Sequence, residues 1–156
     1  MKDANTPGPE SKARLRLWLR LLRVSRAIEA EIRENLRQDH ASTLPRFDVM
    51  SALDRSKTGL KMSELSGQLR VSNGNVTGIV DRLVQDGLVE RLAVPGDRRA
   101  MLARLTDAGQ VAFATMAHTH EGWIDDMLGG LSGEEAEAMS EALRSIADRL
   151  DQRNAG

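Results

Sequence analysis

The apolar residues between positions 72 and 87 recur with the period of an α-helix that buries one face. They are Val76, Ile79, Val80, Leu83 and Val84, and their i, i+3, i+4, i+7, i+8 spacing is that of an amphipathic helix. The opposite face carries small or polar residues: Asn73, Gly74, Thr77, Gly78, Asp81 and Arg82. Ser72 can cap the N-terminus through its hydroxyl, and Gly87 suits the left-handed residue that ends many helices. The pattern therefore predicts a helix between Ser72 and Gly87 with a polar face that a partner can approach closely.

After Gly87 the pattern changes to two short segments rich in Val, Leu and Arg. Residues 88–94 and 100–105 have the character of strands, and the sequence Pro95-Gly96-Asp97-Arg98-Arg99 separates them. This arrangement predicts a β-hairpin with a charged tip. Upstream, residues 62–69 fit a short helix, because Leu65 and Leu69 lie one turn apart. Helix, tight turn, helix and basic hairpin form the layout of a winged helix-turn-helix, whose second helix enters the major groove of DNA.

Helical periodicity predicts four further helices. They span about residues 11–38, 46–53, 107–128 and 133–150. Ser132 and Glu135 have the spacing of a capping box, which supports the start of the last helix. The first and last helices carry apolar stripes that a small winged domain cannot cover alone. We therefore expect these helices to pack on a second copy of the chain.

These elements give a mainly α fold with a small β wing. The expected parts are a flexible N-terminal arm over 1–10, a winged helix-turn-helix domain over 41–106, and a helical dimerisation region over 11–40 and 107–152. The arm contains two prolines and no apolar run. Arginines interrupt the apolar region that follows it, so it does not resemble a signal peptide, and no apolar run approaches the ~20 residues of a membrane span. We expect a cytoplasmic protein without a membrane segment.

The net charge of −1 conceals an uneven distribution of charge along the chain. Residues 41–105 hold 10 basic and 7 acidic side chains, whereas residues 107–156 hold 3 and 10. The excess of positive charge thus lies with the predicted DNA-reading domain. Double-stranded DNA remains the expected partner despite the nearly neutral total.

The sequence offers little that an enzyme or a metal site would need. It has no Cys, which excludes disulfides and thiolate ligands, and it lacks the glycine-rich phosphate loop, HExxH and GxSxG patterns. At 156 residues it is too short for a separate catalytic domain. His118 and His120 are two residues apart and so point to different faces of a helix. We expect no enzymatic activity, no cofactor and no bound metal.

Two blocks of the sequence resemble a known family of bacterial transcription regulators. NVTGIVDRLVQDGLVER, over 75–91, and PGDRRAMLARLTDAG, over 95–109, are similar to the core signature of the MarR family. The most specific part is Asp-Arg-Arg followed by Leu-Thr-x-x-Gly, and the order of elements agrees over about 12–150. The resemblance implies a homodimer with two winged domains that binds a pseudo-palindromic operator. It also implies a repressor that a small phenolic or carboxylate ligand releases from DNA.

The same resemblance suggests which residues contact DNA. We call the helix predicted between Ser72 and Gly87 the reading helix. The residues on it or beside it that the resemblance assigns to DNA contact are Ser72, Asn73, Asn75, Thr77 and Arg82. Arg98 would reach from the wing tip into a minor groove, while Asp97 and Arg99 would fix the tip, Asp97 by pairing with a nearby arginine. Many relatives carry an arginine where this chain has Gly78, so one expected contact is missing.

A ligand site is expected near the start of the winged domain. The first helix supplies cations at Arg20, Arg23 and Arg26, and one or two of these would line a cleft with Trp18, Phe47 and Phe113. Such a cleft suits an aromatic carboxylate or its coenzyme A thioester. The segment LPRFDVM is similar to family members that control aromatic-acid breakdown, although core packing explains the aromatic residues equally well.

Two other functions fit part of the sequence. One is a winged helix used only for protein contacts, which would not require Arg98 and Arg99. The other is a metal-responsive regulator that uses the histidines. Both lack the support that the basic hairpin and the capped helix together give to DNA binding.

Overall fold

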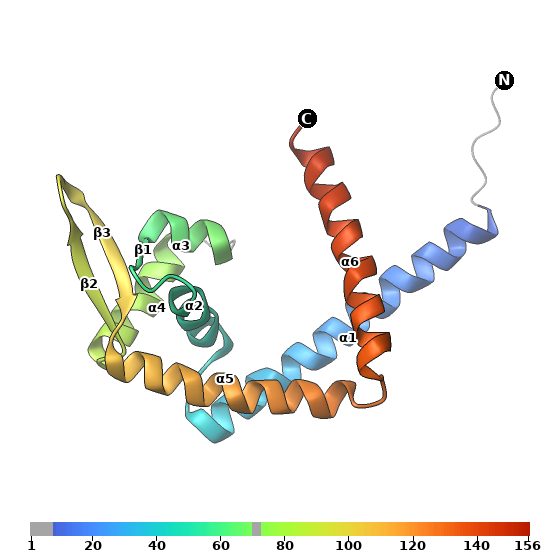
Figure 1. The fold of residues 1–156 in the computed structure, drawn as a ribbon, viewed down its shortest axis with the longest axis horizontal. Coiled ribbons are helices and arrows are strands. Elements are labelled where there is room, and N and C mark those ends of the chain that lie inside the picture. The colour runs from blue at the N-terminus through green and yellow to red at the C-terminus, as the bar shows by residue number, and fades with distance from the viewer. Residues whose placement is uncertain (1–7, 70–72) are drawn as a thin grey trace. The chain divides into compact units, whose positions relative to one another are not determined.

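The structure is a computed structural model that describes residues 8–69 and 73–156. Its elements in chain order are α1 (Pro9–His40), α2 (Leu44–Asp54), β1 (Leu60–Lys61), α3 (Met62–Leu69), α4 (Asn73–Gln85), β2 (Val89–Val94), β3 (Asp97–Leu105), α5 (Asp107–Leu128) and α6 (Gly133–Asn154) (Figure 1). The mainly α class with a small β wing is confirmed. Residues 1–7 of the predicted arm and the predicted cap Ser72 lie outside the described residues.

The β strands form a three-stranded antiparallel sheet in the order β1-β3-β2. Val89 lies opposite Leu105, Leu92 opposite Leu102, and Leu60 of β1 opposite Ala103. The sequence predicted two strands and missed β1. A strand of two residues is too short to show the alternation of apolar and polar side chains that identifies a strand.

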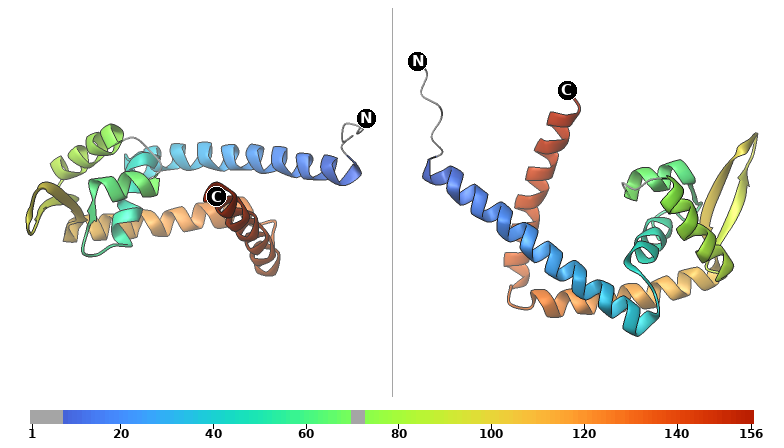
Figure 2. Two further views of the ribbon diagram at one scale, coloured as in Figure 1. Left: turned by 90° about the horizontal axis from the view of Figure 1, so that it is seen from above. Right: turned by 180° about the vertical axis from the view of Figure 1, so that it is seen from behind.

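The hairpin tip is tighter than the five residues predicted from the sequence. The turn is Pro95-Gly96, and β3 already begins at Asp97. The register shifts between Ala93, which lies opposite Met101, and Val94, which lies opposite Asp97. Three residues, Arg98 to Ala100, therefore form a bulge in β3. The far end of the hairpin extends beyond α3 and α4 (Figures 1 and 2).

The core of the winged domain is built around α4. This helix packs against α2, α3 and β2, and its Val76, Val80 and Leu83 are fully buried. Ile79 is partly buried, but Val84 is 37% exposed. The predicted apolar stripe is thus correct in its centre and wrong at Val84, because the helix turns that residue toward solvent before it ends.

The short helix α2 supplies a large part of the same core. Its buried residues are Phe47, Val49, Met50, Ala52 and Leu53. Its N-cap is Thr43, whose hydroxyl accepts a hydrogen bond from the backbone N–H of Arg46 at 3.3 Å. The helix extends from Leu44 to Asp54, slightly beyond the predicted 46–53.

The chain divides into two compact units, Met1–His120 and Glu121–Gly156, and α5 begins in the first and ends in the second. Along the described length of α1 only Ile32 and Leu36 are buried, and Trp18 is 56% exposed.

In α6, which is described in full, no residue is buried, and the predicted capping box of Ser132 and Glu135 is confirmed. Hydrogen bonds to the Ser132 backbone N–H and hydroxyl hold the pKa of Glu135 below its usual value.

None of the helices within 8–69 and 73–156 combines the length and the apolar character that crossing a lipid bilayer requires. The long helices α1, α5 and α6 carry polar or charged residues throughout.

Matched substitutions test the burial of α4. We expect Val80→Ala to lower the free energy of unfolding by about 2 kcal/mol, because it removes buried apolar surface and leaves a cavity. Val84→Ala should cost less than about 1 kcal/mol, since that side chain is already partly in water. Both substitutions raise the helix propensity by the same amount, so this contribution to the free energy of unfolding cancels in the comparison. Chemical denaturation measures both values, and equal costs would contradict the orientation of α4.

Candidate nucleic-acid interface

The face of α4 opposite the core is exposed and made of short side chains. Asn75, Gly78 and Arg82 lie at i, i+3 and i+7, so they form one strip along the helix, and all three are exposed. Thr77 and Asp81 form a second strip beside it. A Cβ added at Gly78 would meet no heavy atom within 4 Å. The space beside Gly78 is thus open, and another molecule can approach the helix backbone there. Ser72 and the side chain of Asn73 lie outside the described residues.

A groove of about 490 Å³ lies between Thr77 of α4 and the hairpin. We call it the wing groove, and its lining residues are Lys61, Met62, Ser63, Thr77, Arg91, Asp97, Arg99, Ala100 and Met101. The structure therefore brings together three residues predicted for DNA contact, Thr77, Asp97 and Arg99. It adds two cations, Lys61 and Arg91, that sequence reasoning missed. Neither has a sequence signal, because each reaches the groove only through the pairing of the strands.

An ion pair joins the wing to the reading helix. Arg91 Nη2 on β2 lies 2.5 Å from Asp81 Oδ1 on α4. A similar pair, Arg46 Nη2 to Asp86 Oδ2 at 2.5 Å, ties the start of α2 to the residue after α4. Both Asp81 and Asp86 thus form ion pairs with arginines from other elements. These pairs hold α4 between the wing and α2.

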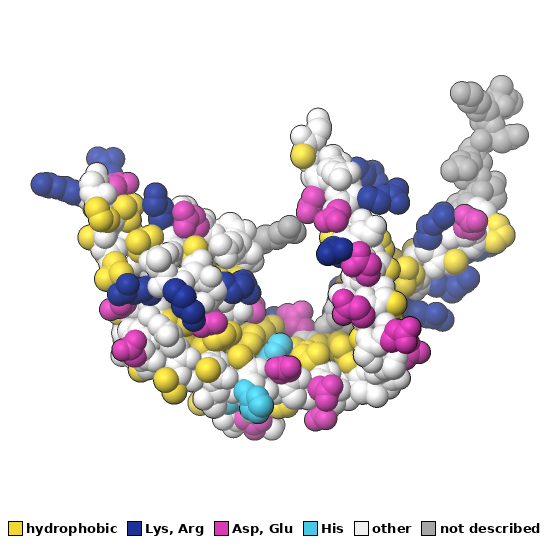
Figure 3. Space-filling view, viewed as in Figure 1, with side chains coloured by type: hydrophobic (Ala, Val, Ile, Leu, Met, Phe, Trp, Pro, Cys, Tyr) yellow, Lys and Arg dark blue, Asp and Glu magenta, His cyan; other side chains and the backbone are white. Residues whose placement is uncertain are grey.

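Asp97 fixes the base of the bulge through the backbone. Its Oδ1 accepts a hydrogen bond from the backbone N–H of Arg99 at 3.0 Å. The predicted pairing of Asp97 with a nearby arginine stays a prediction. The bulge removes Arg99 from the regular ladder, and a carboxylate two residues earlier can satisfy its N–H. The side chains of Arg98 and Arg99 are exposed, and dark-blue cationic side chains gather at the far end of the hairpin in Figure 3.

The residues predicted for ligand binding fall into two groups. Phe47 and Phe113 are buried, with ring centroids 5.5 Å apart, and His120 stacks on Phe47 at 4.7 Å. Trp18 is exposed on the N-terminal half of α1, ahead of the first buried residue of that helix. Trp18 forms the second group together with Arg20, Arg23 and Arg26, which are exposed on the same stretch of α1. The structure therefore brings together the two phenylalanines, which belong to α2 and α5.

The histidines take part in packing and hydrogen bonding. His40 Nε2 lies 2.6 Å from Thr119 Oγ1, His120 stacks on Phe47, and His118 is exposed. Among the described residues, no group of three or more His, Asp or Glu side chains is placed to hold a metal ion.

This arrangement defines a winged helix-turn-helix protein with a cationic groove between wing and reading helix. Residues 42–101 match the sequence profile of the MarR family. The chain is 33% identical to a MarR family transcriptional regulator from Silicibacter pomeroyi, over 92% of this chain and 99% of that one, with a TM-score of 0.74. It is also 29% identical over 132 residues to the HTH-type transcriptional regulator MhqR of Bacillus subtilis, covering 85% of this chain and 90% of MhqR.

The chain therefore belongs to the MarR family and is a DNA-binding transcriptional regulator, as its sequence resemblance indicated. A further structure, the MarR family regulator Sco3205 from Streptomyces coelicolor in complex with DNA, shares the fold with a TM-score of 0.78. It is 22% identical and covers 96% of this chain and 93% of its own. That likeness concerns the fold alone.

A double-mutant cycle tests whether Asp81 and Arg91 stabilise the wing against α4. Because both side chains are partly exposed, at 47% and 32%, we expect a coupling energy of only about 0.5–1 kcal/mol between Asp81→Asn and Arg91→Gln. Denaturation of the two single variants and the double variant gives this value. A coupling that is zero within error would mean that the two residues are merely close.

Proposed function

We propose that the protein is a homodimeric repressor that binds a pseudo-palindromic operator and releases it when a small aromatic anion binds. The observation that carries this proposal is the exposed face of α4, which bears short side chains and lies beside the wing groove. Two arginines in the bulge favour DNA over a protein partner, since a wing used only for protein contacts has no need of exposed cations at its tip.

Each part of the interface has a distinct task on DNA in this proposal. Asn75 and Thr77 read base edges in the major groove, where amide and hydroxyl groups can distinguish the base pairs. Arg82, at the far end of the same face, contacts phosphates, which fixes the position of the helix without reading sequence. Ser72 and Asn73 would bind the backbone beside the start of α4.

The wing adds contacts outside the major groove. Arg98 inserts into a narrow minor groove, where the negative potential is strongest. Asp97 positions the bulge, and Arg99 binds a phosphate from the wing groove together with Lys61.

Exposed apolar side chains support the homodimer. On α6, Met139, Leu143, Ile146 and Leu150 follow the i, i+4, i+7, i+11 spacing of a single stripe, and each is between 43% and 51% exposed. On α1, Leu15, Trp18 and Leu19 are exposed to a similar degree. Apolar surface of this extent on a folded chain marks a protein interface. A symmetric dimer places its two reading helices about 34 Å apart, one turn of DNA.

The effector in this proposal is an aromatic carboxylate or its coenzyme A thioester. Phe47 and Phe113 would provide the apolar wall, and Trp18 would stack on the aromatic ring. One or two of Arg20, Arg23 and Arg26 would neutralise the carboxylate. A role in the control of aromatic-acid breakdown, suggested by the segment around Phe47, is part of the same proposal.

Two substitutions separate the wing from the helix. We expect Arg98→Ala to weaken binding to all duplexes alike and to reduce the slope of log K against log salt by about 1, because the interface loses one positive charge that displaces counterions from the DNA. Asn75→Ala should change preference at one position in each half-site, by about 1–3 kcal/mol. Binding-site selection followed by salt titration measures both effects. Arg144→Ala, which removes the same charge from α6, is the control. Equal, sequence-blind losses from Arg98→Ala and Asn75→Ala would refute the assigned roles.

Calorimetric titration with aromatic carboxylic acids and their coenzyme A thioesters tests the effector. Heat of binding together with loss of operator binding is expected. Substitution of Arg20, Arg23 or Arg26 by Ala should weaken the response about tenfold or more at one position, the effect of losing one hydrogen bond to a charged group. The control is Arg33→Ala, whose guanidinium already pairs with Glu29. If no compound gives heat or releases DNA, the effector class is wrong.

A further inference from the structure

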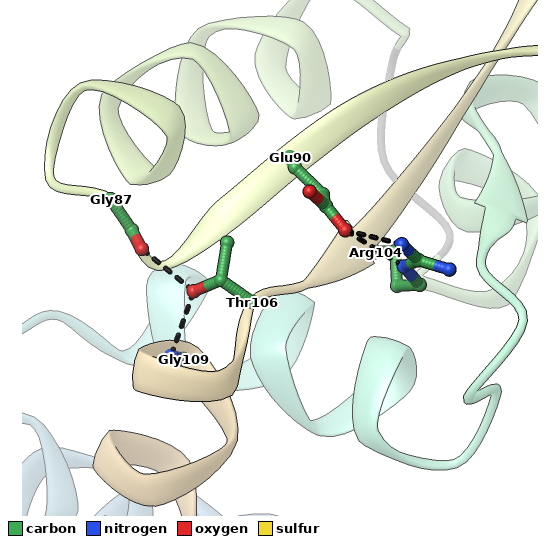
Figure 4. Close-up of polar contacts among 5 residues, drawn as sticks. All are labelled: Gly87, Glu90, Arg104, Thr106 and Gly109. Carbon is green, nitrogen blue, oxygen red and sulfur yellow. Dashed lines mark hydrogen bonds and ion pairs between the residues drawn. The ribbon is translucent and has the colours of Figure 1, made fainter.

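The end of the reading helix and the start of α5 meet at a hydrogen-bonded junction. Thr106 Oγ1 donates a hydrogen bond to the carbonyl oxygen of Gly87 at 2.7 Å. The same oxygen accepts a hydrogen bond from the backbone N–H of Gly109 at 3.0 Å. Figure 4 shows Thr106 between Gly87 on one side and Gly109 on the other. One hydroxyl group thus connects the segment after α4 to the first turn of α5.

The backbone at this junction approaches more closely than any side chain would permit. The backbone N–H of Thr106 donates to the carbonyl oxygen of Leu88 at 3.1 Å. A Cβ added at Gly109 would lie 1.9 Å from that same oxygen. Position 109 therefore requires glycine because a side chain would collide with the backbone of Leu88, and not because the backbone needs a conformation that only glycine adopts. The Leu-Thr-x-x-Gly motif that is specific in the sequence supplies both parts of the junction.

The end of α4 is itself held in one conformation. Gly87 has φ of 74°, and its N–H donates to the carbonyl oxygen of Val84 at 3.0 Å, while the N–H of Leu88 donates to that of Leu83 at 2.9 Å. These two bonds form a Schellman motif, which ends a helix in a defined direction. Because Leu83 is fully buried, the motif is anchored in the core. A change in the direction of the chain at Thr106 would therefore shift α4 as a whole.

We propose that Thr106, through its hydroxyl group, and Gly109, through its lack of a side chain, are positioning residues. Together they set the spacing between the two reading helices of the dimer. This inference rests on the proposed homodimer with two half-sites. The helix α5 has 22 residues and is about 33 Å long. A rotation of about 6° at the junction moves its other end by about 3.4 Å, the rise of one base pair. Small errors at the junction thus become errors in half-site spacing.

The test compares duplexes that differ only in spacing. A duplex selected by the unmodified protein from a random-sequence pool is resynthesised with one base pair added or removed between the half-sites. Thr106→Val keeps the shape of the side chain but loses the hydroxyl. We expect it to reduce the preference for the selected spacing by about fivefold, the effect of one net hydrogen bond. Thr115→Val is the matched control, because that hydroxyl donates only within α5, to the carbonyl oxygen of Val111 at 3.1 Å.

A purely structural role for Thr106 predicts a different outcome. It would lower affinity for every spacing by the same factor and leave the preference unchanged, and that result would overturn the proposal. Thr106→Ser, which retains the hydroxyl, should restore the preference to within about twofold of the unmodified protein. If the unmodified protein selects no duplex with two half-sites, the proposed function fails instead.

Hydrogen exchange at the Gly109 amide tests the junction without DNA. Thr106→Val should accelerate exchange at this amide about tenfold relative to Thr115→Val, since the amide loses its acceptor. Equal exchange rates in the two variants would overturn the proposal, whatever the result with DNA. Gly109→Ala should have the same effect on spacing as Thr106→Val, provided that circular dichroism shows it to be folded.

Discussion

The structure of the winged domain depends on the burial of one side of α4. Val76, Val80 and Leu83 are fully buried against α2, α3 and β2. Because these three side chains anchor the helix in the core, its other face can carry exposed residues such as Asn75 and Gly78. A Cβ at Gly78 would meet no heavy atom within 4 Å, so this face leaves room for a nucleic acid. Stability and recognition are thus assigned to opposite sides of one helix of 13 residues.

The need of backbone N–H groups for partners explains the shape of the wing. The bulge in β3 removes three residues from the regular ladder and directs two arginines outward. Asp97 satisfies the N–H of Arg99, so the bulge leaves that donor paired. The ion pair of Arg91 with Asp81 connects the hairpin to α4. The cations of the wing groove are therefore positioned by strand pairing, and the net charge of the chain is a poor guide to them.

Local patterns in the sequence were enough to predict the helices, the hairpin and the capping box. Each of these depends on periodicity or on residues within four positions of one another. The strand β1, the bulge and the roles of Lys61 and Arg91 could not be predicted in this way, because they depend on pairing between distant segments. The structure places Phe47 and Phe113 side by side, whereas their role in a ligand site, like that of Trp18, stays a prediction.

Hydroxyl-radical footprinting of the full chain on a duplex that it selects from a random-sequence pool tests the central claim most directly. Two copies that each place an α4 in the major groove are expected to protect two segments related by two-fold symmetry, with centres about 10 base pairs apart or a multiple of that distance. A single protected segment, or two segments without two-fold symmetry, would contradict the arrangement of α4 and wing described for this protein.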